Sequence, residues 1–158
     1  NVTKMKEMFN SAKEFNSAID NWDMRNIKST NNMFYNAESF NQDINSWDTS
    51  NIINMGLMFA YAKKFNQDIS NWNVINVENM KNMFQNSDFN QDLNNWNLKN
   101  IQDKSSIFIN CALEKEDNLP YWANLSIEKI KDILHKKELF NQLCNEMNQK
   151  NINNKNGI

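Results

Sequence analysis

Three aspartates recur at one position of a repeated tetrad, and they are the first residues of this chain that could do chemistry. Asp43, Asp68 and Asp92 each end a Phe-Asn-Gln-Asp sequence that is followed by Ile or Leu. Carboxylate oxygens are ligands that Ca²⁺ prefers, so a column of them could bind the ion weakly between repeats. The alternative is a turn in which each carboxylate accepts backbone N–H groups. Ala18 replaces the aspartate in the first copy, and we predict no metal site.

The remaining catalytic residue types are sparse. His135 is the single histidine, and it lies among lysines with no nucleophile near it in the sequence. The chain has only two glycines, which excludes the glycine-rich loops that cradle phosphate groups. No standard catalytic constellation can be assembled from these residues, so we predict that the protein is not an enzyme and has no cofactor.

Cys111 and Cys144 are the only cysteines, and they are 33 residues apart. This spacing matches neither a metal site nor a Cys-x-x-Cys redox motif. Cys111 occupies a position that alanine or serine fills in the preceding repeats, as in Ala62 and Ser87. We therefore expect Cys111 to be a small buried residue, and a disulfide with Cys144 is the alternative.

The charge of the chain gives no sign of a nucleic-acid partner. The 17 basic and 19 acidic residues leave a net charge of −2. No apolar run approaches the roughly 18 residues that a membrane-spanning helix needs. The sequence opens within a repeat and without an initiator Met, so we expect a targeting segment to lie outside it.

A 25-residue repeat must position all of these side chains. The tetrad begins at Phe40, Phe65 and Phe89, with a diverged copy at Phe15, and a tryptophan follows each copy. Met-Phe pairs mark the other half of the unit. A fixed period in this range predicts a stack of like units, each of which buries its apolar face against its neighbours.

Within one unit, the apolar spacing changes halfway. Residues 77–87 carry apolar side chains at intervals of three and four, which predicts a short helix. Residues 89–96 alternate apolar residues with short polar stretches, which predicts a short strand or a tight corner. Stacking such units predicts an α/β solenoid, a leucine-rich-repeat-like right-handed coil of about four to five 25-residue units.

Equivalent positions of such a stack lie above one another, so the Phe and Trp residues should form interior columns. Two series of asparagines should bond the backbone of the neighbouring coil. The series are Asn26, Asn51, Asn76 and Asn100, and Asn16, Asn41, Asn66 and Asn90. Recognition of a partner then falls to surface positions that stacking does not dictate. These candidates are Arg25, Lys28, Tyr35, Glu38, Tyr61, Lys63, Lys64 and Tyr121.

The repeat pattern decays near Leu113, and a different pattern follows. Ser126 is a good N-cap before a stripe of apolar residues at helical spacing. We divide the chain into a repeat solenoid at 1–113, a capping segment at 114–150 with a helix from about residue 126, and a disordered tail at 151–158. The helix either covers the last coil, as solenoid ends require, or mediates oligomerisation.

The sequence Met-Phe-x-x-Ala followed by Phe-Asn-Gln-Asp-Ile-x-x-Trp-Asp/Asn resembles the BspA-type leucine-rich-repeat surface proteins. That family is abundant among mycoplasma-type lipoproteins. The resemblance covers residues 1–111, and the Asn, Lys and Ile usage suits an AT-rich genome of that kind. Departures are Ala18, Thr30 and Lys104 at a usual Met position, and a one-residue deletion before Phe89.

The resemblance implies a non-enzymatic, extracellular module that is lipid-anchored at the cell surface through a segment outside this chain. It implies adhesion to host or extracellular-matrix proteins and carries over no catalytic or ligand residues. We expect a protein ligand, no nucleic acid, membrane contact only through the anchor, and a monomer. The alternative is a structural or self-assembling surface scaffold, in which the terminal coils or the Ser126 helix mediate self-contact.

Overall fold

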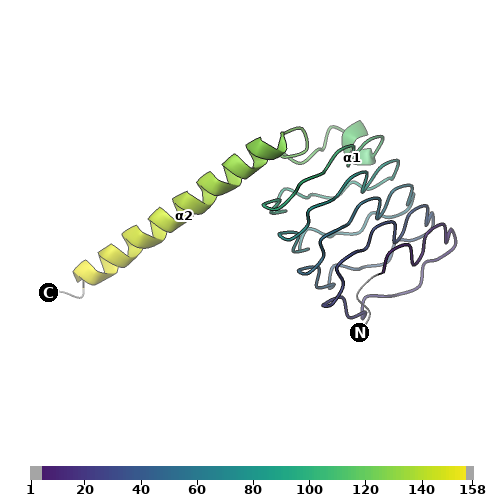
Figure 1. Cartoon of the computed structure of the whole chain (residues 1–158), viewed down its shortest axis with the longest axis horizontal. Helices are drawn as coiled ribbons and strands as arrows, with labels where there is room; N and C mark the ends of the chain where they lie inside the picture. The colour runs from purple at the N-terminus through teal and green to yellow at the C-terminus, as the bar shows by residue number, and fades with distance from the viewer. Residues whose placement is uncertain (1–4, 156–158) are drawn as a thin grey trace. The chain divides into compact units, whose positions relative to one another are not determined.

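The computed structural model describes the backbone of residues 5–155 and the burial of side chains in residues 5–149. The chain forms two compact units, Asn1–Asn124 and Leu125–Ile158. The first unit contains the repeats, which follow one another as stacked coils, and it contains the short helix α1 (Ala112–Lys115) (Figure 1). The helix α2 (Ile127–Lys155) makes up the second unit.

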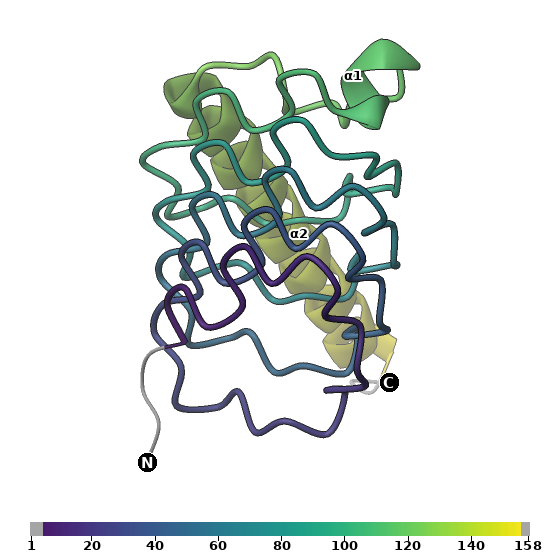
Figure 2. The same cartoon turned by 90° about the vertical axis from the view of Figure 1, so that its right-hand side faces the viewer.

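Backbone hydrogen bonds join each coil to the next. The N–H groups of Asn32 and Phe34 donate to carbonyls of the following coil at 3.0 Å each, and Leu57 repeats the Asn32 bond one coil later at 2.9 Å. Isolated parallel bridges connect equivalent residues in the same half of the unit. They link Ser29, Asn54, Asn79 and Asp103 in sequence. The coils are seen from the side in Figure 2, and alternate N–H groups in one half of each coil before the last are satisfied by the neighbouring coil.

The short helix expected at residues 77–87 is absent from the described structure, which has a series of turns there. The Met83 N–H donates to the Met80 carbonyl at 3.1 Å, and the Gln85 N–H donates to the Asn82 carbonyl at 3.1 Å. Alternate N–H groups instead donate to the next coil, so the i to i−4 bonds of an α-helix cannot form. The apolar spacing of three and four therefore comes from successive three-residue turns.

Two positions in each coil have a left-handed backbone, which also rules out a continuous helix. Asparagine tolerates this conformation because its short side chain bonds locally. The asparagines with positive φ are Asn32, Asn36, Asn82, Asn86 and Asn110. Leu57 and Tyr61 adopt the same conformation, at φ values of 57° and 60°. The described structure likewise has no strand at residues 89–96, where the backbone is irregular with one turn at residues 94–95.

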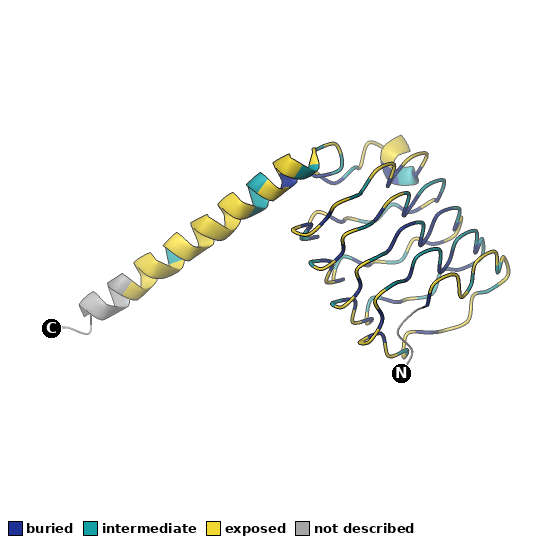
Figure 3. Ribbon diagram, viewed as in Figure 1, coloured by how far each residue is buried: buried dark blue, intermediate teal, exposed yellow. Residues whose placement is uncertain are grey.

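The interior of the stack is formed by phenylalanine columns, as predicted from the repeat. In the middle coils, Phe59 stacks on Phe34 at 5.6 Å between ring centroids and on Phe84 at 5.8 Å. A second column runs beside it, with Phe65 at 3.9 Å from Phe59. Figure 3 shows that buried residues recur along every coil of the stack. These rings are fully buried in the middle coils and provide much of the apolar contact between repeats.

Tryptophans form a third column. The indole N–H groups of Trp47, Trp72 and Trp96 donate to isoleucine carbonyls of the preceding coil at 2.9, 3.1 and 3.2 Å. Trp122 extends the column after the repeat pattern has decayed, and its indole donates to the Leu93 carbonyl at 3.0 Å. The hydrogen bond explains why a tryptophan, and not another apolar residue, recurs at this buried position.

Both asparagine series bond the neighbouring coil, which confirms the prediction. The Asn41 side-chain carbonyl accepts the Asn66 N–H at 3.0 Å, and Asn66 accepts the Asn90 N–H at 2.8 Å. In the other series, Asn51 and Asn76 donate their amides to backbone carbonyls of the preceding coil at 2.9 and 2.8 Å. The polar character of the chain is therefore part of its internal bonding.

The helix expected from about residue 126 is α2, whose first turn is capped by Ser126 accepting the Lys129 N–H at 3.2 Å. Residues 151–155 of the expected tail belong to this helix, and residues 156–158 lie outside the described part. Among the described residues, no helix has the length and apolar character that crossing a membrane requires.

Both cysteines are free thiols, so the alternative disulfide is not formed in this structure. Cys111 is fully buried, as its position in the repeat predicted. Burial is also the main cause that raises the pKa of its thiol. Cys144 lies in α2 and is partly exposed.

Candidate functional site

The eight candidate surface residues divide into three places on the first unit. The largest group comprises two tyrosines with charged neighbours on adjacent coils. We call it the tyrosine–lysine corner, and its residues are Tyr35, Glu38, Tyr61, Lys63 and Lys64. The two tyrosines are partly exposed, and Lys63 and Lys64 are exposed.

The two tyrosine rings of the corner contact each other across the coil boundary. Their centroids are 5.5 Å apart at an interplanar angle of 63°, an edge-to-face arrangement. The Tyr61 N–H donates to the Gln85 carbonyl at 2.8 Å, which fixes the backbone beneath the ring. The contact was not foreseen, because Tyr35 and Tyr61 occupy neighbouring positions of the repeat and not equivalent ones. It makes one aromatic surface of two side chains that the sequence presents separately.

Charged residues follow both tyrosines closely in the sequence. Lys13 joins the corner through an ion pair with Glu38, at 2.7 Å between the ammonium nitrogen and a carboxylate oxygen. Their hydrogen bond is the main cause that lowers the pKa of Glu38 and raises the pKa of Lys13. Lys63 donates to the Asn86 carbonyl at 3.0 Å, and the Lys64 N–H donates to the Glu38 carbonyl at 3.2 Å. The corner thus combines three lysines with one paired glutamate.

Arg25 and Lys28 form a second place, around Asn51. The Asn51 amide donates to the Arg25 carbonyl at 2.9 Å, and Lys28 donates to the Asn51 side-chain carbonyl at 3.2 Å. The Arg25 guanidinium binds Asp23 through two bonds of 2.8 and 2.9 Å. These bonds, with the Arg25 N–H, lower the pKa of Asp23 to about 2. Because Asp23 neutralises Arg25, this pair offers less free charge than the corner.

Tyr121 is the third place and stands apart from the other candidates. Its side chain is 49% exposed, and its N–H donates to the Asn94 side-chain carbonyl at 2.9 Å. No hydrogen bond, ion pair or ring contact joins it to the corner among residues 5–149. It lies in the segment that places Trp122 in the tryptophan column.

The carboxylates of the aspartate column accept backbone N–H groups in turns, which is the alternative to metal binding. The carboxylates of Asp43, Asp68 and Asp92 each accept the N–H of the residue two positions later, at 2.8 to 2.9 Å. The Ser70 N–H is the main cause that lowers the pKa of Asp68. In the part of the chain that the structure describes, no three His, Cys, Asp or Glu side chains come together in a way that could hold a metal ion.

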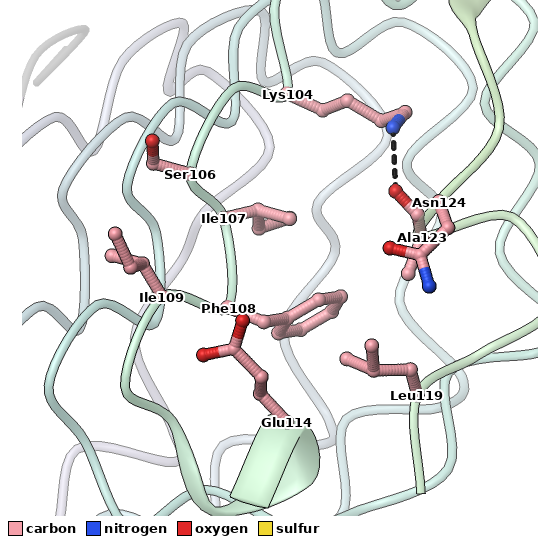
Figure 4. Close-up of a pocket in the computed structure, with 9 residues that line it drawn as sticks. All are labelled: Lys104, Ser106, Ile107, Phe108, Ile109, Glu114, Leu119, Ala123 and Asn124. Carbon is pink, nitrogen blue, oxygen red and sulfur yellow. Dashed lines mark hydrogen bonds between the residues drawn. The ribbon is translucent and has the colours of Figure 1, made fainter. Parts of the chain in front are cut away.

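A hollow on the last coil is a further site, and sequence reasoning missed it. It has a volume of about 270 Å³ and lies between the last coil and the segment that follows α1 (Figure 4). Its apolar wall includes Ile107, Phe108 and Leu119. Lys104 stands where three of the four earlier coils have methionine, and its ammonium donates to the Ala123 carbonyl at 2.8 Å beside the hollow. Burial lowers the pKa of this lysine. Its departure from the methionine pattern was the available signal.

Comparison with known proteins places the repeat in a family. No curated protein and no solved structure matches the chain significantly. A family model does match, over residues 3–122, which include every coil of the first unit. The match covers more than half of the sequence, so the chain belongs to the family described as Mycoplasma protein of unknown function, DUF285.

Proposed function

We propose that this protein is a non-enzymatic, surface-exposed module that binds a host or extracellular-matrix protein through the tyrosine–lysine corner. The repeat uses its phenylalanines and tryptophans to hold coils together, and in the middle coils these rings are buried. In the same coils, the aromatic side chains that remain partly exposed are Tyr35 and Tyr61, which lie outside the repeat pattern. Tyrosine is enriched at protein interfaces because its ring is rigid, largely apolar and polar at one end.

The backbone at Tyr61 is the observation that carries the proposal. Its φ is 60°, and the equivalent positions in three other coils are Asn36, Asn86 and Asn110. A left-handed conformation costs an ordinary residue about 1–2 kcal/mol, whereas asparagine adopts it more easily. Folding alone therefore favours asparagine at this position. A tyrosine retained there at a cost in stability is expected where its ring serves binding.

The charges of the corner indicate the chemistry of the partner. Lys13, Lys63 and Lys64 outnumber Glu38, which is already paired with Lys13. Lys63 and Lys64 follow Tyr61 closely in the sequence and are exposed. An acidic protein surface with an apolar centre would complement this arrangement. Since the charges are solvent-exposed, salt should weaken the association mainly by slowing it.

Binding to immobilised matrix proteins, beginning with fibronectin, tests this proposal. Tyr61→Asn removes the ring and relieves the backbone, so the variant should fold at least as well as the wild type and lose binding. Leu57→Asn is the matched control, because it also introduces an asparagine, at the other left-handed position of that coil. It should bind like the wild type. Equal binding by the wild type and Tyr61→Asn would exclude the corner as the binding surface.

We also propose that the stack is a right-handed solenoid of the leucine-rich-repeat kind, in which turns replace the usual helix of each unit. The coil-to-coil bonds and parallel bridges support this. In the same proposal, the module stands outside the cell and is lipid-anchored through a segment that this chain does not contain. This setting rests on the resemblance of the repeat to mycoplasma-type surface lipoproteins, and the matching family is itself described as a Mycoplasma family. Protease accessibility on intact cells tests it, since an intracellular protein would be protected.

A self-assembling surface scaffold is the second candidate function, and α2 favours it. Four large apolar side chains of this helix are at least 49% exposed. They are Leu139, Phe140, Leu143 and Met147. Such a stripe is typical of helices that associate with one another. Light scattering across a range of concentrations distinguishes the two functions, because a concentration-independent monomer would exclude self-assembly.

A further inference from the structure

The bonds between coils follow a fixed rule that extends to the edge of the last coil. In each coil, four alternate N–H groups donate to four carbonyls of the next coil. The final complete set runs from Met80, Asn82, Phe84 and Asn86, at 2.8 to 3.0 Å. The acceptors are the carbonyls of Asp103, Ser105, Ile107 and Ile109. Each coil therefore has a row of donors on one edge and a row of acceptors on the other.

In the last coil, the corresponding donors are Lys104, Ser106, Phe108 and Asn110, and no further coil follows them. The Asn110 N–H is satisfied by the Glu114 carboxylate at 2.7 Å. The N–H groups of Ser106 and Phe108 have no acceptor among the described residues. Phe108 as a residue is only 4% exposed, and a backbone donor that stays unpaired in a buried setting is costly.

The hollow lies on this donor edge. Lys104, Ser106 and Phe108 all line it, and Figure 4 shows Phe108 between the Glu114 carboxylate and Leu119. Its volume of about 270 Å³ is near the lower end of ligand pockets, so it encloses only part of an occupant. The remaining contact must come from hydrogen bonds along the edge. The hollow lies where half of one more coil would begin.

We propose that this edge binds a peptide segment of repeat sequence from another chain, which adds half a coil to the stack through its backbone carbonyls. The same interaction already occurs within the chain, because each coil presents four backbone carbonyls to the N–H groups of the coil before it. The mode corresponds to strand addition at an open sheet edge, with turns in place of the strand. This inference does not depend on the tyrosine–lysine corner.

The charges around the hollow favour a neutral peptide over a free anion. Glu114 lines the hollow with a carboxylate, which would repel an anion placed beside it. The Lys104 ammonium is already bonded to the Ala123 carbonyl. The Glu114 carboxylate also accepts the Asn110 N–H, as a carbonyl of an incoming coil would. It therefore acts as a partial substitute for the missing coil. The occupant must also tolerate left-handed residues, as the Asn-rich repeat sequence does.

A fluorescent peptide with the sequence of residues 76–87 tests the proposal by its anisotropy when the full chain is added. We expect saturable binding, and none by a peptide of the same residues in scrambled order. By amide hydrogen exchange, Ser106 and Phe108 should exchange faster than Asn82 and Phe84 in the free protein and become protected when the peptide binds. Equal binding by the scrambled peptide, or unchanged exchange at both residues, would overturn the proposal.

Variants at the edge separate this site from others. Ala123→Trp fills the hollow and should weaken binding at least about tenfold, whereas Ala18→Trp on the exposed surface of the first coil should not. Glu114→Ala frees the Asn110 donor and should tighten binding about three- to tenfold, the effect of one hydrogen bond. Glu114→Gln keeps an acceptor and should bind like the wild type. Inorganic phosphate that displaces the peptide at millimolar concentration would instead identify an anion site and contradict the proposal.

Discussion

The coil stack and α2 belong to one chain, but the hydrogen bonds inside each of them span different distances along the sequence. In the stack, side-chain hydrogen bonds connect residues 25 positions apart, as between Asn41 and Asn66. In α2, they connect residues four positions apart, as between Lys136 and Asp132. Phe59 in the stack is fully buried, while Phe140 in α2 is 65% exposed. The same residue types therefore contribute to stability in the stack and remain available for contact in the helix.

Because of this difference, the effect of a substitution on stability depends first on the unit in which it lies and only then on the residue type. In a stack of repeats, each coil depends on its neighbours, so the loss of one interior ring weakens two interfaces. In a single helix, an exposed side chain has few contacts to lose. All five tryptophans lie in the repeat unit, so their fluorescence reports on the stack alone. Helical circular dichroism follows α2.

The largest expected effect is that of Phe59→Ala. Its ring contacts Phe34, Phe65 and Phe84, and the substitution leaves a cavity between three coils. We expect the free energy of unfolding of the stack to fall by about 3–5 kcal/mol. Urea unfolding monitored by tryptophan fluorescence measures this loss.

Phe140→Ala in α2 is the matched control for that substitution. Because its side chain is mostly exposed, the stability of the protein should change by less than about 0.5 kcal/mol. Equal losses in the two variants would show that α2 packs as tightly as the stack, and the comparison between the units would fail.

The columns of the fold were predictable from the sequence, whereas the local backbone was not. A residue type that returns after 25 positions must meet its own copies in a stack, which identifies the Phe, Trp and Asn columns. The helix expected at residues 77–87 failed because three-residue turns and helical turns give the same apolar spacing. The signal against a helix was asparagine at intervals of four, as in Asn82 and Asn86, where the backbone is left-handed.

The candidate surface was only partly predictable, for a related reason. Departure from the repeat identified Tyr35 and Tyr61 as surface residues. Their contact depends on how far one coil is displaced along the next, and the repeat does not specify that for non-equivalent positions. The hollow at Ser106 and Phe108 was missed because backbone N–H groups carry no residue-type signal. Only the structure shows which of them lack an acceptor.

Replacement of asparagine by alanine should have opposite effects on stability in the two units. Asn41→Ala removes the acceptor of the Asn66 N–H and of the Gln67 amide, both at 3.0 Å. The stack should lose about 1 kcal/mol of stability. Asn145→Ala lies on the exposed surface of α2, where alanine has the higher helix propensity, and should slightly raise the helical signal. Thermal unfolding followed by fluorescence and by circular dichroism measures both, and a stabilised Asn41→Ala stack would show that the bonds of this asparagine series do not hold the coils together.

A smaller effect, of the reverse sign, is expected when leucine is replaced by asparagine. Leu57 has a φ of 57°, and asparagines fill the equivalent positions 32 and 82. Leu57→Asn should stabilise the stack by up to about 1 kcal/mol, because asparagine adopts the left-handed backbone at less cost. Leu139→Asn in α2 should reduce helicity instead, since asparagine is the poorer helix former. The urea midpoint of the first variant and the circular dichroism of the second measure these changes, and a destabilised Leu57→Asn stack would show that burial of the leucine outweighs its backbone.

The smallest effect concerns exposed ion pairs, where the two units should behave alike. The pKa of Asp23 is lowered to about 2, first by the hydrogen bond from the Arg25 side chain and then by the Arg25 N–H. In α2, the bond from Lys136 at 2.9 Å is the main cause that lowers the pKa of Asp132. Exposed pairs of this kind contribute little, and salt screens them in any fold.

The pH dependence of Asp23→Asn isolates that contribution. Because the folded pKa lies below the ordinary value of 3.8, the charged form stabilises the fold above that value. The stabilisation fades as the pH falls through about 2. The variant keeps the turn, as Asn97 does when its side chain accepts the Lys99 N–H at 3.1 Å. The wild type should therefore melt slightly higher than Asp23→Asn near neutral pH, and the gap should close toward pH 2. Other carboxylates titrate equally in both proteins, so a gap that instead widened in acid would mean that the Arg25 bond does not hold Asp23 ionised.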